Sequence, residues 1–408
     1  MTRADSSWGA GLTVVVVGGR LSIWPFIADT GHRLGIRLIA AIKQDIEDDV
    51  GEQGWDRVLS WTARGPRTQY EKAADGLALA LRGERVDGVV TFSDYCVPLA
   101  GMLAERLNVA RCPADALWSC KSKFELYRLL HEAGSPYPPQ ARVLDSRVDL
   151  AACVEAVGLP AIVRISHGYG AIGTRLGSDL VEIAERLERV RSLSASPEYD
   201  FSGFQQDVLL VEYLQGSEHD IDVVMMDGDA RFWYVTDNGP TDLPYFRETT
   251  HLLPSRLPPS VQAQLFEASV SCLRALGLRQ GVFNVEMRLT ADGPRLIEIN
   301  LRMGGFYIRK FTEYVWGYDL CEAAFRCHLC GFMCFPSDTV SLADVPAVAL
   351  NIDCGESAVT EYEVPMRMLS FPGATVAEAV HRAVESAPRI LGKARGATVQ
   401  GYLRSFLP

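Results

Sequence analysis

The sequence predicts a multidomain protein of mixed α/β and α+β class. Residues 13–17 form a continuous β-branched run, and shorter apolar runs follow at 38–42 and 88–92, a pattern typical of parallel strands that are buried on both faces. A helical segment, 97–107, comes directly after the third run. Downstream, alternating polar and apolar residues separated by turn residues predict antiparallel strands. With 408 residues, 48% of them apolar, the chain has room for several such units and an ample core.

Composition excludes several classes of protein. The net charge is −11 and no run of Lys or Arg occurs, so we expect no nucleic-acid partner. No segment approaches the roughly 20 apolar residues that span a bilayer, and the apolar run at 12–17 is too short for a signal peptide. The 10 cysteines are scattered, which favours reduced thiols in the cytoplasm over a disulfide framework. The sequence therefore predicts a cytoplasmic protein that has no membrane partner.

Four of these cysteines have a spacing that resembles a metal site: Cys321, Cys327, Cys330 and Cys334. They lie in an apolar, helical segment that has no second CxxC pair to complete such a site. Unmodified cysteine is among the most buried residue types. We therefore favour core packing over metal binding for this cluster.

The first unit carries no dinucleotide fingerprint. Gly18 and Gly19 follow the first strand, but the GxGxxG spacing is absent, so we interpret them as a close turn between strand and loop. A helix is predicted from about residue 119 to 133, because Gly134 and the prolines after it form a typical helix end.

A glycine-rich loop follows the next predicted strand, at 159–165. The strand carries Arg164 near its end, and the loop contains Gly168, Gly170 and Gly173. Glycines at this spacing let backbone N–H groups turn inward around an anion. The motif is weak on its own, because many glycine loops bind nothing. A cation before it and acidic residues further along strengthen the interpretation.

Acidic residues occur at regular positions between 209 and 224. An apolar strand brings in Glu212, a short linker brings in Glu218, and a second strand alternates Asp220 with Asp222. Glu218 follows Gly216 and is well placed to accept hydrogen bonds from ribose hydroxyls. The alternative for each acid taken singly is a solvated loop residue.

The richest segment is 286–305. Glu298, Asn300 and Arg302 share one parity along a predicted strand, so their side chains point to one face. A hairpin that turns at 291–294 would bring Glu286 into the same cluster. Hard oxygen ligands beside a fixed cation suit Mg²⁺ bound to phosphates. This segment predicts a phosphoryl-transfer site.

Together these segments resemble the ATP-grasp superfamily and, within it, the carboxylate-amine ligases of the carnosine synthase and L-amino-acid ligase kind. Four segments carry the resemblance, in the family's order: Lys123 before the Gly134 turn, Arg164 with the glycine loop, residues 211–218, and Glu286 followed by 298–305. It covers the chain to about residue 335. It implies a Rossmann-like pre-ATP-grasp domain at 1–117, a linker helix and lid subdomain at 118–215, a subdomain with the metal site at 216–340, and a small α+β cap at 341–408.

The resemblance also implies roles for individual residues. Those that bind ATP, the co-substrate, would be Lys123, Arg164, Gly168, Gly170, Gly173, Val211, Glu212, Leu214 and Glu218. Glu286, Glu298 and Asn300 would hold a pair of Mg²⁺ ions, with Mn²⁺ as an alternative metal. Arg302 would be catalytic, together with the amides of Gly304 and Gly305. The glycine loop and the polar segment 237–251 are candidate lids, and a homodimer is the candidate assembly.

One residue departs from the family pattern. Arg164 stands where the family usually has a second phosphate-binding lysine. A guanidinium keeps the charge and can bind phosphate through two N–H groups, so we expect ATP binding to survive with a different contact geometry.

The implied reaction is the ATP-dependent joining of a small carboxylate, such as an amino acid, to an amine through an acyl phosphate. Two other functions stay open: an ATP-grasp enzyme that uses bicarbonate or a thiol, and a noncatalytic nucleotide-binding regulator. A carboxylase would be expected to accompany a lysine-centred biotin-carrier segment, which is missing, and a regulator would be expected to lose a metal ligand, whereas all three positions are filled.

Overall fold

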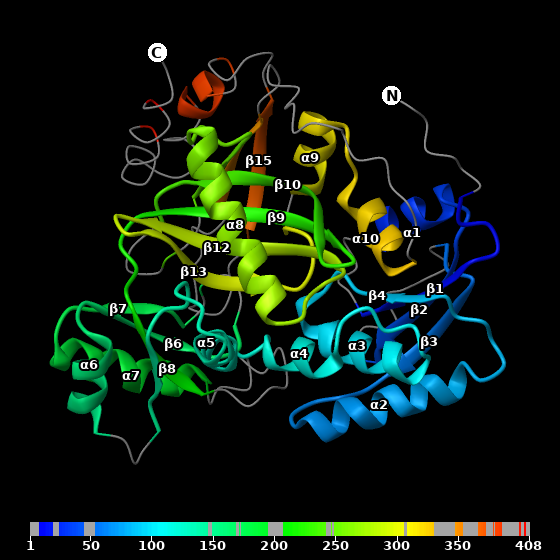
Figure 1. Ribbon diagram of the computed structural model, residues 1–408, viewed down its shortest axis with the longest axis horizontal. Helices are drawn as coiled ribbons and strands as arrows, with labels where there is room; N and C mark the ends of the chain where they lie inside the picture. Colours follow the sequence, from blue (N-terminus) through cyan, green and yellow to red (C-terminus); the bar gives the residue numbers. More distant parts are fainter. Residues whose placement is uncertain are drawn as a thin grey trace.

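The computed structural model describes residues 8–18, 24–44, 54–145, 149–168, 171, 173–194, 207–241, 246, 249–305, 308–329, 347–353, 366–372, 378, 380–385, 400 and 404. Three sheets organise them (Figure 1). Within this part of the chain, no helix has the length and apolar character needed to cross a bilayer.

The N-terminal unit is a parallel sheet with the strand order β3-β2-β1-β4. Its strands are β1 (Thr13–Val17), β2 (Arg37–Lys43), β3 (Arg57–Trp61) and β4 (Gly88–Val90). Its helices are α1 (Trp24–Arg33), α2 (Arg67–Ala80), the 3₁₀ turn η3 (Asp94–Cys96) and α3 (Val97–Arg106). All three predicted strands are present. Strand β3 was not predicted.

Strand β4 is shorter than expected because a side chain takes over the pairing. The Thr91 hydroxyl donates to the Val17 carbonyl at 2.8 Å, so the chain leaves the sheet after Val90. The interpretation of Gly18 as a close turn agrees with its φ of +67°. A Cβ atom at this position would overlap with the Cys96 side chain.

The predicted helix at 119–133 corresponds to α5 (Lys123–Glu132), and a separate helix, α4 (Ala114–Ser119), precedes it. Our expected start was wrong because Ser122 is an N-cap: its hydroxyl accepts from the Glu125 amide at 3.4 Å. The end was predicted correctly. Gly134 has a φ of +74°, in the left-handed region that glycine adopts without strain.

A second unit is a small antiparallel sheet with the order β5-β8-β6-β7. Its elements are β5 (Ala141–Val143), α6 (Leu150–Val157), β6 (Ala161–Ile165), β7 (Arg175–Gly177), α7 (Leu180–Ser194) and β8 (Val208–Glu212). Helices α6 and α7 share an apolar core with these strands. Figure 1 shows this unit at the lower left, apart from the N-terminal unit at the lower right.

The third unit is an antiparallel sheet with the order β13-β12-β9-β10-β11-β14-β15. Its strands are β9 (Ser217–Met226), β10 (Asp229–Asn238), β11 (Thr250–Leu253), β12 (Gly281–Thr290), β13 (Gly293–Asn300), β14 (Ala347–Asp353) and β15 (Met366–Pro372). Three helices accompany it: α8 (Pro259–Ala275), α9 (Ile308–Trp316) and α10 (Leu320–His328). Strands β14 and β15, from the expected C-terminal cap, continue this sheet through β11. The segment 237–251, one of the two candidate lids, is shorter than expected because its ends belong to β10 and β11.

The two faces of the large sheet differ. One face is covered by α8 and α5 over a continuous apolar core (Figure 1). On the other face, apolar residues such as Val224, Tyr234 and Val282 pack with α10 and the N-terminal unit. Further along the same strands, polar residues follow at alternate positions. We call six of them the polar face: Asp220, Asp222, Asn284, Glu286, Glu298 and Asn300.

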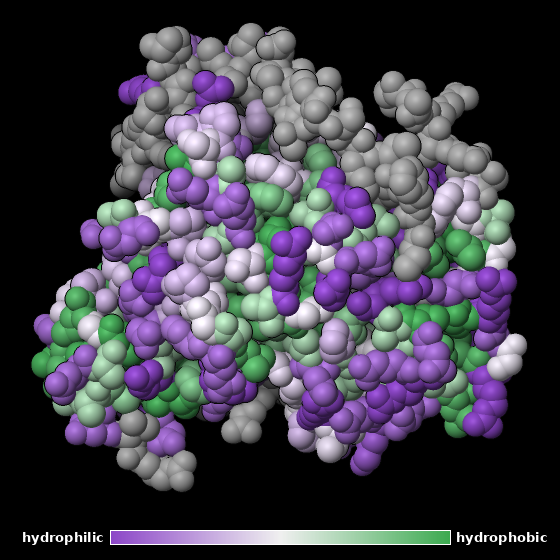
Figure 2. Space-filling model, in the orientation of Figure 1, coloured by the Kyte–Doolittle hydropathy of each residue, from purple (hydrophilic) through white to green (hydrophobic). Residues whose placement is uncertain are grey.

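Hydrophilic residues also dominate the surface of the N-terminal unit over α2 (Figure 2). This helix buries Tyr70, Ala74 and Leu77 against the sheet and leaves its charged residues outside. The side of the N-terminal unit that carries α2 is therefore solvated. Its other side packs on α10 and the large sheet.

Candidate active site

The β12–β13 hairpin brings the predicted metal ligands together. Glu286 pairs with Glu298 and Asn284 pairs with Asn300, so four polar side chains occupy neighbouring positions on one face. The predicted turn is also present, with Gly293 at a φ of +107° where β13 begins. The shared orientation of Glu298 and Asn300, expected from their parity, is confirmed by this register.

A β-bulge in β13 explains why Glu298 lies on the polar face although Leu296, two residues earlier, lies on the apolar one. Leu296 has the same parity as Glu298, yet it is completely buried in the core on the opposite face. The register shifts here: Glu286 pairs with Glu298 but Met287 pairs with Leu296, so Ile297 is the extra residue. The Tyr127 hydroxyl donates to the Ile297 carbonyl at 2.6 Å and holds the bulge. The two consecutive apolar residues Leu296 and Ile297 break the alternation of the strand, a signal that the sequence analysis did not use.

Two cations from other parts of the chain approach Glu298. Lys123, the first residue of α5, places its Nζ 2.9 Å from Glu298 Oε1 and donates to the Gly168 carbonyl at 3.1 Å. Arg164, from β6, places Nη2 3.9 Å from the other oxygen, Oε2. Burial lowers the pKa of Lys123, and the Arg164 charge lowers it further, while Glu298 opposes both. The structure thus groups residues expected to bind phosphate with one expected to bind metal.

Arg164 has capacity for a further partner. Its Nε is buried and has no hydrogen-bond partner among the described residues. A buried N–H without a partner costs free energy, which an anion in the site would recover. Of the two later glycines in the loop after β6, Gly173 has a φ of +68°, and Gly170 lies outside the described residues.

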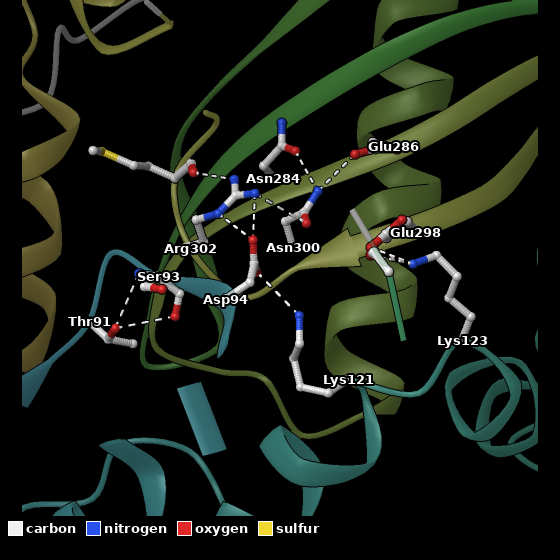
Figure 3. A network of polar contacts seen from close by, with 12 residues as sticks. Thr91, Ser93, Asp94, Lys121, Lys123, Asn284, Glu286, Glu298, Asn300 and Arg302 are labelled. Carbon is white, nitrogen blue, oxygen red and sulfur yellow. Dashed lines mark hydrogen bonds and ion pairs between the residues drawn. The ribbon is translucent and has the colours of Figure 1, made fainter. Parts of the chain in front are cut away.

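The oxygen donors near Glu286 suit a hard cation. Asn300 Nδ2 donates to Glu286 Oε1 at 2.8 Å and to Asn284 Oδ1 at 3.0 Å (Figure 3). The Asn300 oxygen consequently points to Arg302, 3.4 Å away. A cation bound to Glu286 and Asn300 together requires the amide to turn over. With that rotation, the amide oxygen joins the Glu286 carboxylate on the face that also carries Glu298, and oxygen donors of this kind are typical of Mg²⁺ sites.

Arg302 is held by a residue that the sequence analysis missed. Its Nε donates to Asp94 Oδ2 at 2.6 Å and its Nη1 to the Met303 carbonyl at 2.8 Å. Lys121 lies 3.5 Å from the other oxygen of Asp94 (Figure 3). Burial alone would raise the pKa of Asp94, but Arg302 and Lys121 together bring it below its ordinary value. A signal was present, since Asp94 comes shortly after a predicted parallel strand, where α/β sheets bind ligands.

The Gly304 amide has a different partner from the one we expected. It donates to Asp222 Oδ1 at 2.7 Å, so in this structure it is not available to an oxyanion. Asp222 Oδ2 also accepts from Asn284 Nδ2 at 3.3 Å. A Cβ atom at Gly304 would lie 2.9 Å from the Ile308 side chain and 3.0 Å from Asp222, so both side chains would have to shift. Gly305 adjoins this contact and lies near Arg302.

The predicted nucleotide hinge is partly engaged in structural contacts. Val211 lies inside β8 between two paired strands, and Glu212 binds Arg295 through both carboxylate oxygens, at 3.2 and 2.8 Å. Glu218 lies in β9 rather than in a linker, where it accepts from Arg288 at 2.6 Å. Leu214 lies in the connection between the strands and is 8% exposed.

The cysteine cluster is outside this site. Cys321 and Cys327 are buried in α10 and neither belongs to a disulfide, and Cys330 and Cys334 lie outside the described residues. Burial raises the pKa of Cys321, as expected for a core thiol. Among the residues that the structure describes, no group of three or more His, Cys, Asp or Glu could hold a metal.

Comparison with known proteins identifies the fold. Residues 157–310 match the family model of the ATP-grasp domain, and these residues run from the last residue of α6 into α9. The chain also superposes on the L-amino acid ligase from Bacillus licheniformis with a TM-score of 0.70, covering 84% of this chain and 81% of that one at 19% identity. The chain has the ATP-grasp fold. The predicted resemblance is therefore confirmed.

Two further similar proteins extend the comparison. The biotin carboxylase domain of the Hydrogenobacter thermophilus 2-oxoglutarate carboxylase, solved with MgADP and bicarbonate, superposes with a TM-score of 0.69 at 15% identity, over 92% of this chain and 89% of that chain. Carnosine synthase 1 of Homo sapiens is 34% identical over 359 residues, 78% of this chain but 43% of that protein. The chain thus spans less than half the length of this relative.

The buried Asp222 should make stability depend on pH. Burial raises its pKa to about 6, although the Gly304 amide opposes this. Between about pH 4, the ordinary value, and pH 6 the folded chain therefore binds more protons than the unfolded chain, and stability falls as pH rises. Above pH 6 the folded chain carries Asp222 in its charged form, which lowers the free energy of unfolding by about 3 kcal/mol. Asp222→Asn lacks this cost, so its unfolding free energy relative to the native chain should rise by about that amount between pH 4 and 7.

Urea unfolding at several pH values measures this difference. Asp229→Asn, in the neighbouring strand and exposed, is the matched control for loss of a carboxylate. A native-minus-variant difference for Asp222→Asn that stays constant from pH 4 to 7 would show that this carboxyl does not titrate in that range.

Proposed function

We propose that the chain is an ATP-dependent ligase that joins a carboxylate to an amine and releases ADP and phosphate. The observation that carries this proposal is the convergence of Lys123, Arg164 and Arg302 on the polar face that presents Glu286, Glu298 and Asn300. Cations beside oxygen donors suit a nucleotide triphosphate and its metal. The similarity to carnosine synthase 1 supports amide formation as the reaction.

ATP would bind between the small sheet and the large one. Lys123 and Arg164 would bind phosphate oxygens, beneath the loop that contains Gly168, Gly170 and Gly173. The segment after Val211 and Glu212, which includes Leu214, would offer backbone groups to adenine. Glu218, which accepts from Arg288 in this structure, would accept hydrogen bonds from the ribose hydroxyls.

Magnesium, when bound, would neutralise phosphate charge and align the phosphates for in-line attack. Glu286, Glu298 and Asn300 would hold it. Lys123 and Arg164 would then exchange Glu298 for phosphate oxygens, because the metal would neutralise the carboxylates in their place. Lys123, Arg164 and Glu298 would therefore have one set of partners before ATP binds and another afterwards. The number of ions stays a prediction.

The chemistry forms one bond at a time. A carboxylate oxygen of the first substrate attacks the γ-phosphorus, and the bond to the β-phosphate oxygen breaks, which gives an acyl phosphate and ADP. The amine of the second substrate then attacks the acyl carbon, loses a proton, and expels phosphate. Arg302 would stabilise negative charge on the acyl oxygen, while Gly305 and its neighbours would shape the pocket around it. Little covalent work falls to the protein, so positioning dominates.

Amino acids are the first substrates to test, since L-amino acid ligase is among the structural relatives. The cytoplasmic location and the homodimer stay predictions.

The ligase proposal predicts the products. Incubation with ATP, Mg²⁺ and pooled amino acids should give ADP and phosphate in equal amounts, with an amide in the mass spectrum. Glu298→Ala should abolish this turnover, because the site then loses a metal ligand and the partner of Lys123. Glu267→Ala, exposed on α8 over the opposite face, is the control and should retain activity. Formation of AMP and pyrophosphate would contradict an acyl phosphate.

A second prediction concerns the residue that departs from the family pattern. Arg164→Lys keeps the charge, so the Kd for an ATP analogue should change little, whereas Arg164→Ala should weaken binding about 10- to 100-fold. Isothermal titration calorimetry with Mg²⁺ and a non-hydrolysable analogue measures both. Arg142→Ala, in strand β5 of the same sheet, is the matched control for loss of an arginine. Equal affinity for native and Arg164→Ala would remove this residue from the phosphate site.

A further inference from the structure

Asp94 occupies a special place in the N-terminal sheet. The connection from β1 leads to β2 on one side, whereas β4 lies on the other side of β1. The carboxyl ends of β1 and β4 therefore form the point where the strand order reverses, and ligands of open α/β sheets bind there. Asp94 begins η3 four residues after β4 ends. It belongs to a different unit from the metal ligands, yet it contacts their neighbour Arg302.

The loop before Asp94 is tied to the sheet. The Thr91 hydroxyl donates to the Val17 carbonyl at 2.8 Å. It also accepts from the Ser93 amide at 3.2 Å (Figure 3). Close packing between Gly18 and Cys96 fixes the other end of the turn. A carboxylate on so constrained a loop has a defined position, which suits it to orient a flexible partner.

Arg302 uses most of its donors before any substrate is present. Nε and Nη2 both contact Asp94 Oδ2, at 2.6 and 2.5 Å, and Nη1 donates to the Met303 carbonyl. Only the 3.4 Å contact with Asn300 involves the polar face. The plane of the guanidinium is thus set by a residue of the N-terminal unit, far away in the sequence.

Without Asp94 the guanidinium would have other attractive partners. Glu286 and Glu298 both act on it electrostatically, and it is largely buried, so it would move towards these carboxylates. There it would compete with a metal ion for the same oxygens. Asp94 prevents this competition by offering a carboxylate on the opposite side.

We propose that Asp94 is the positioning residue for Arg302: it keeps the guanidinium off Glu286 and Glu298 and aimed at the acyl group of the substrate. This role rests on the proposed ligase function. Asp94 is unsuited to act as a base for the incoming amine, because Arg302 and Lys121 hold it in its charged, weakly basic form. Its function is exerted through Arg302.

A double-mutant cycle tests this role. Asp94→Asn should lower kcat about 10- to 100-fold, the cost expected of a misplaced catalytic group, and change KM for ATP much less. It should also raise the Mg²⁺ concentration needed for half-maximal rate, because Arg302 then competes for the metal ligands. In the Arg302→Gln background, Asp94→Asn should cause almost no further loss, and Asp94→Glu should restore part of the rate in the native background.

Glu84→Gln is the matched control, since Glu84 also pairs with arginines in the N-terminal unit but lies outside the site. It should leave kcat and the Mg²⁺ requirement unchanged. If the native chain is active and the losses from Asp94→Asn and Arg302→Gln multiply, Asp94 does not act through Arg302, and the positioning role is wrong. If the native chain forms no amide from any amino-acid pair, the ligase function fails first, and this role fails with it.

Discussion

The structure depends on pairing charges that come from separate parts of the chain. Glu298 on the large sheet contacts Lys123 from the linker helix and Arg164 from the small sheet, and Arg302 contacts Asp94 from the N-terminal unit. A partly buried charge that loses its partner is costly, so each pair draws two units together. In the proposed reaction, Lys123 and Arg164 exchange Glu298 for phosphate, whereas Arg302 keeps Asp94. The residues that pair the units would then also bind the ligand.

The placement of these charges follows from strand alternation on one sheet. Along β9 and β12 the same face changes from Val224 and Val282 to Asp222 and Asn284 within two residues. The apolar part packs on α10 and the N-terminal unit, which carries Asp94 to the border of the polar part. The opposite face stays apolar beneath α8. One sheet therefore provides both the packing surface between units and the floor of the proposed site.

Local patterns predicted much of this arrangement. Strand parity and the Gly293 turn placed Glu286, Glu298 and Asn300 together, and β-branched runs predicted the parallel strands. Contacts that depend on the packing of distant segments escaped prediction. Asp94 and Arg302 are 208 residues apart, and Asp222 and Gly304 are 82 apart, so no local pattern links either pair. The bulge at Ile297 was also missed, because an extra residue changes the register without changing the composition.

An isotope experiment tests the account most directly. The substrate whose carboxylate becomes the new amide is labelled with ¹⁸O in that carboxylate, and the released phosphate is analysed by mass spectrometry. If the carboxylate attacks the γ-phosphorus, one labelled oxygen must pass to phosphate when the amine expels it. The account predicts one ¹⁸O atom in each phosphate released with an amide. Unlabelled phosphate released alongside the amide would contradict the acyl phosphate, and with it the chemistry proposed for the polar face.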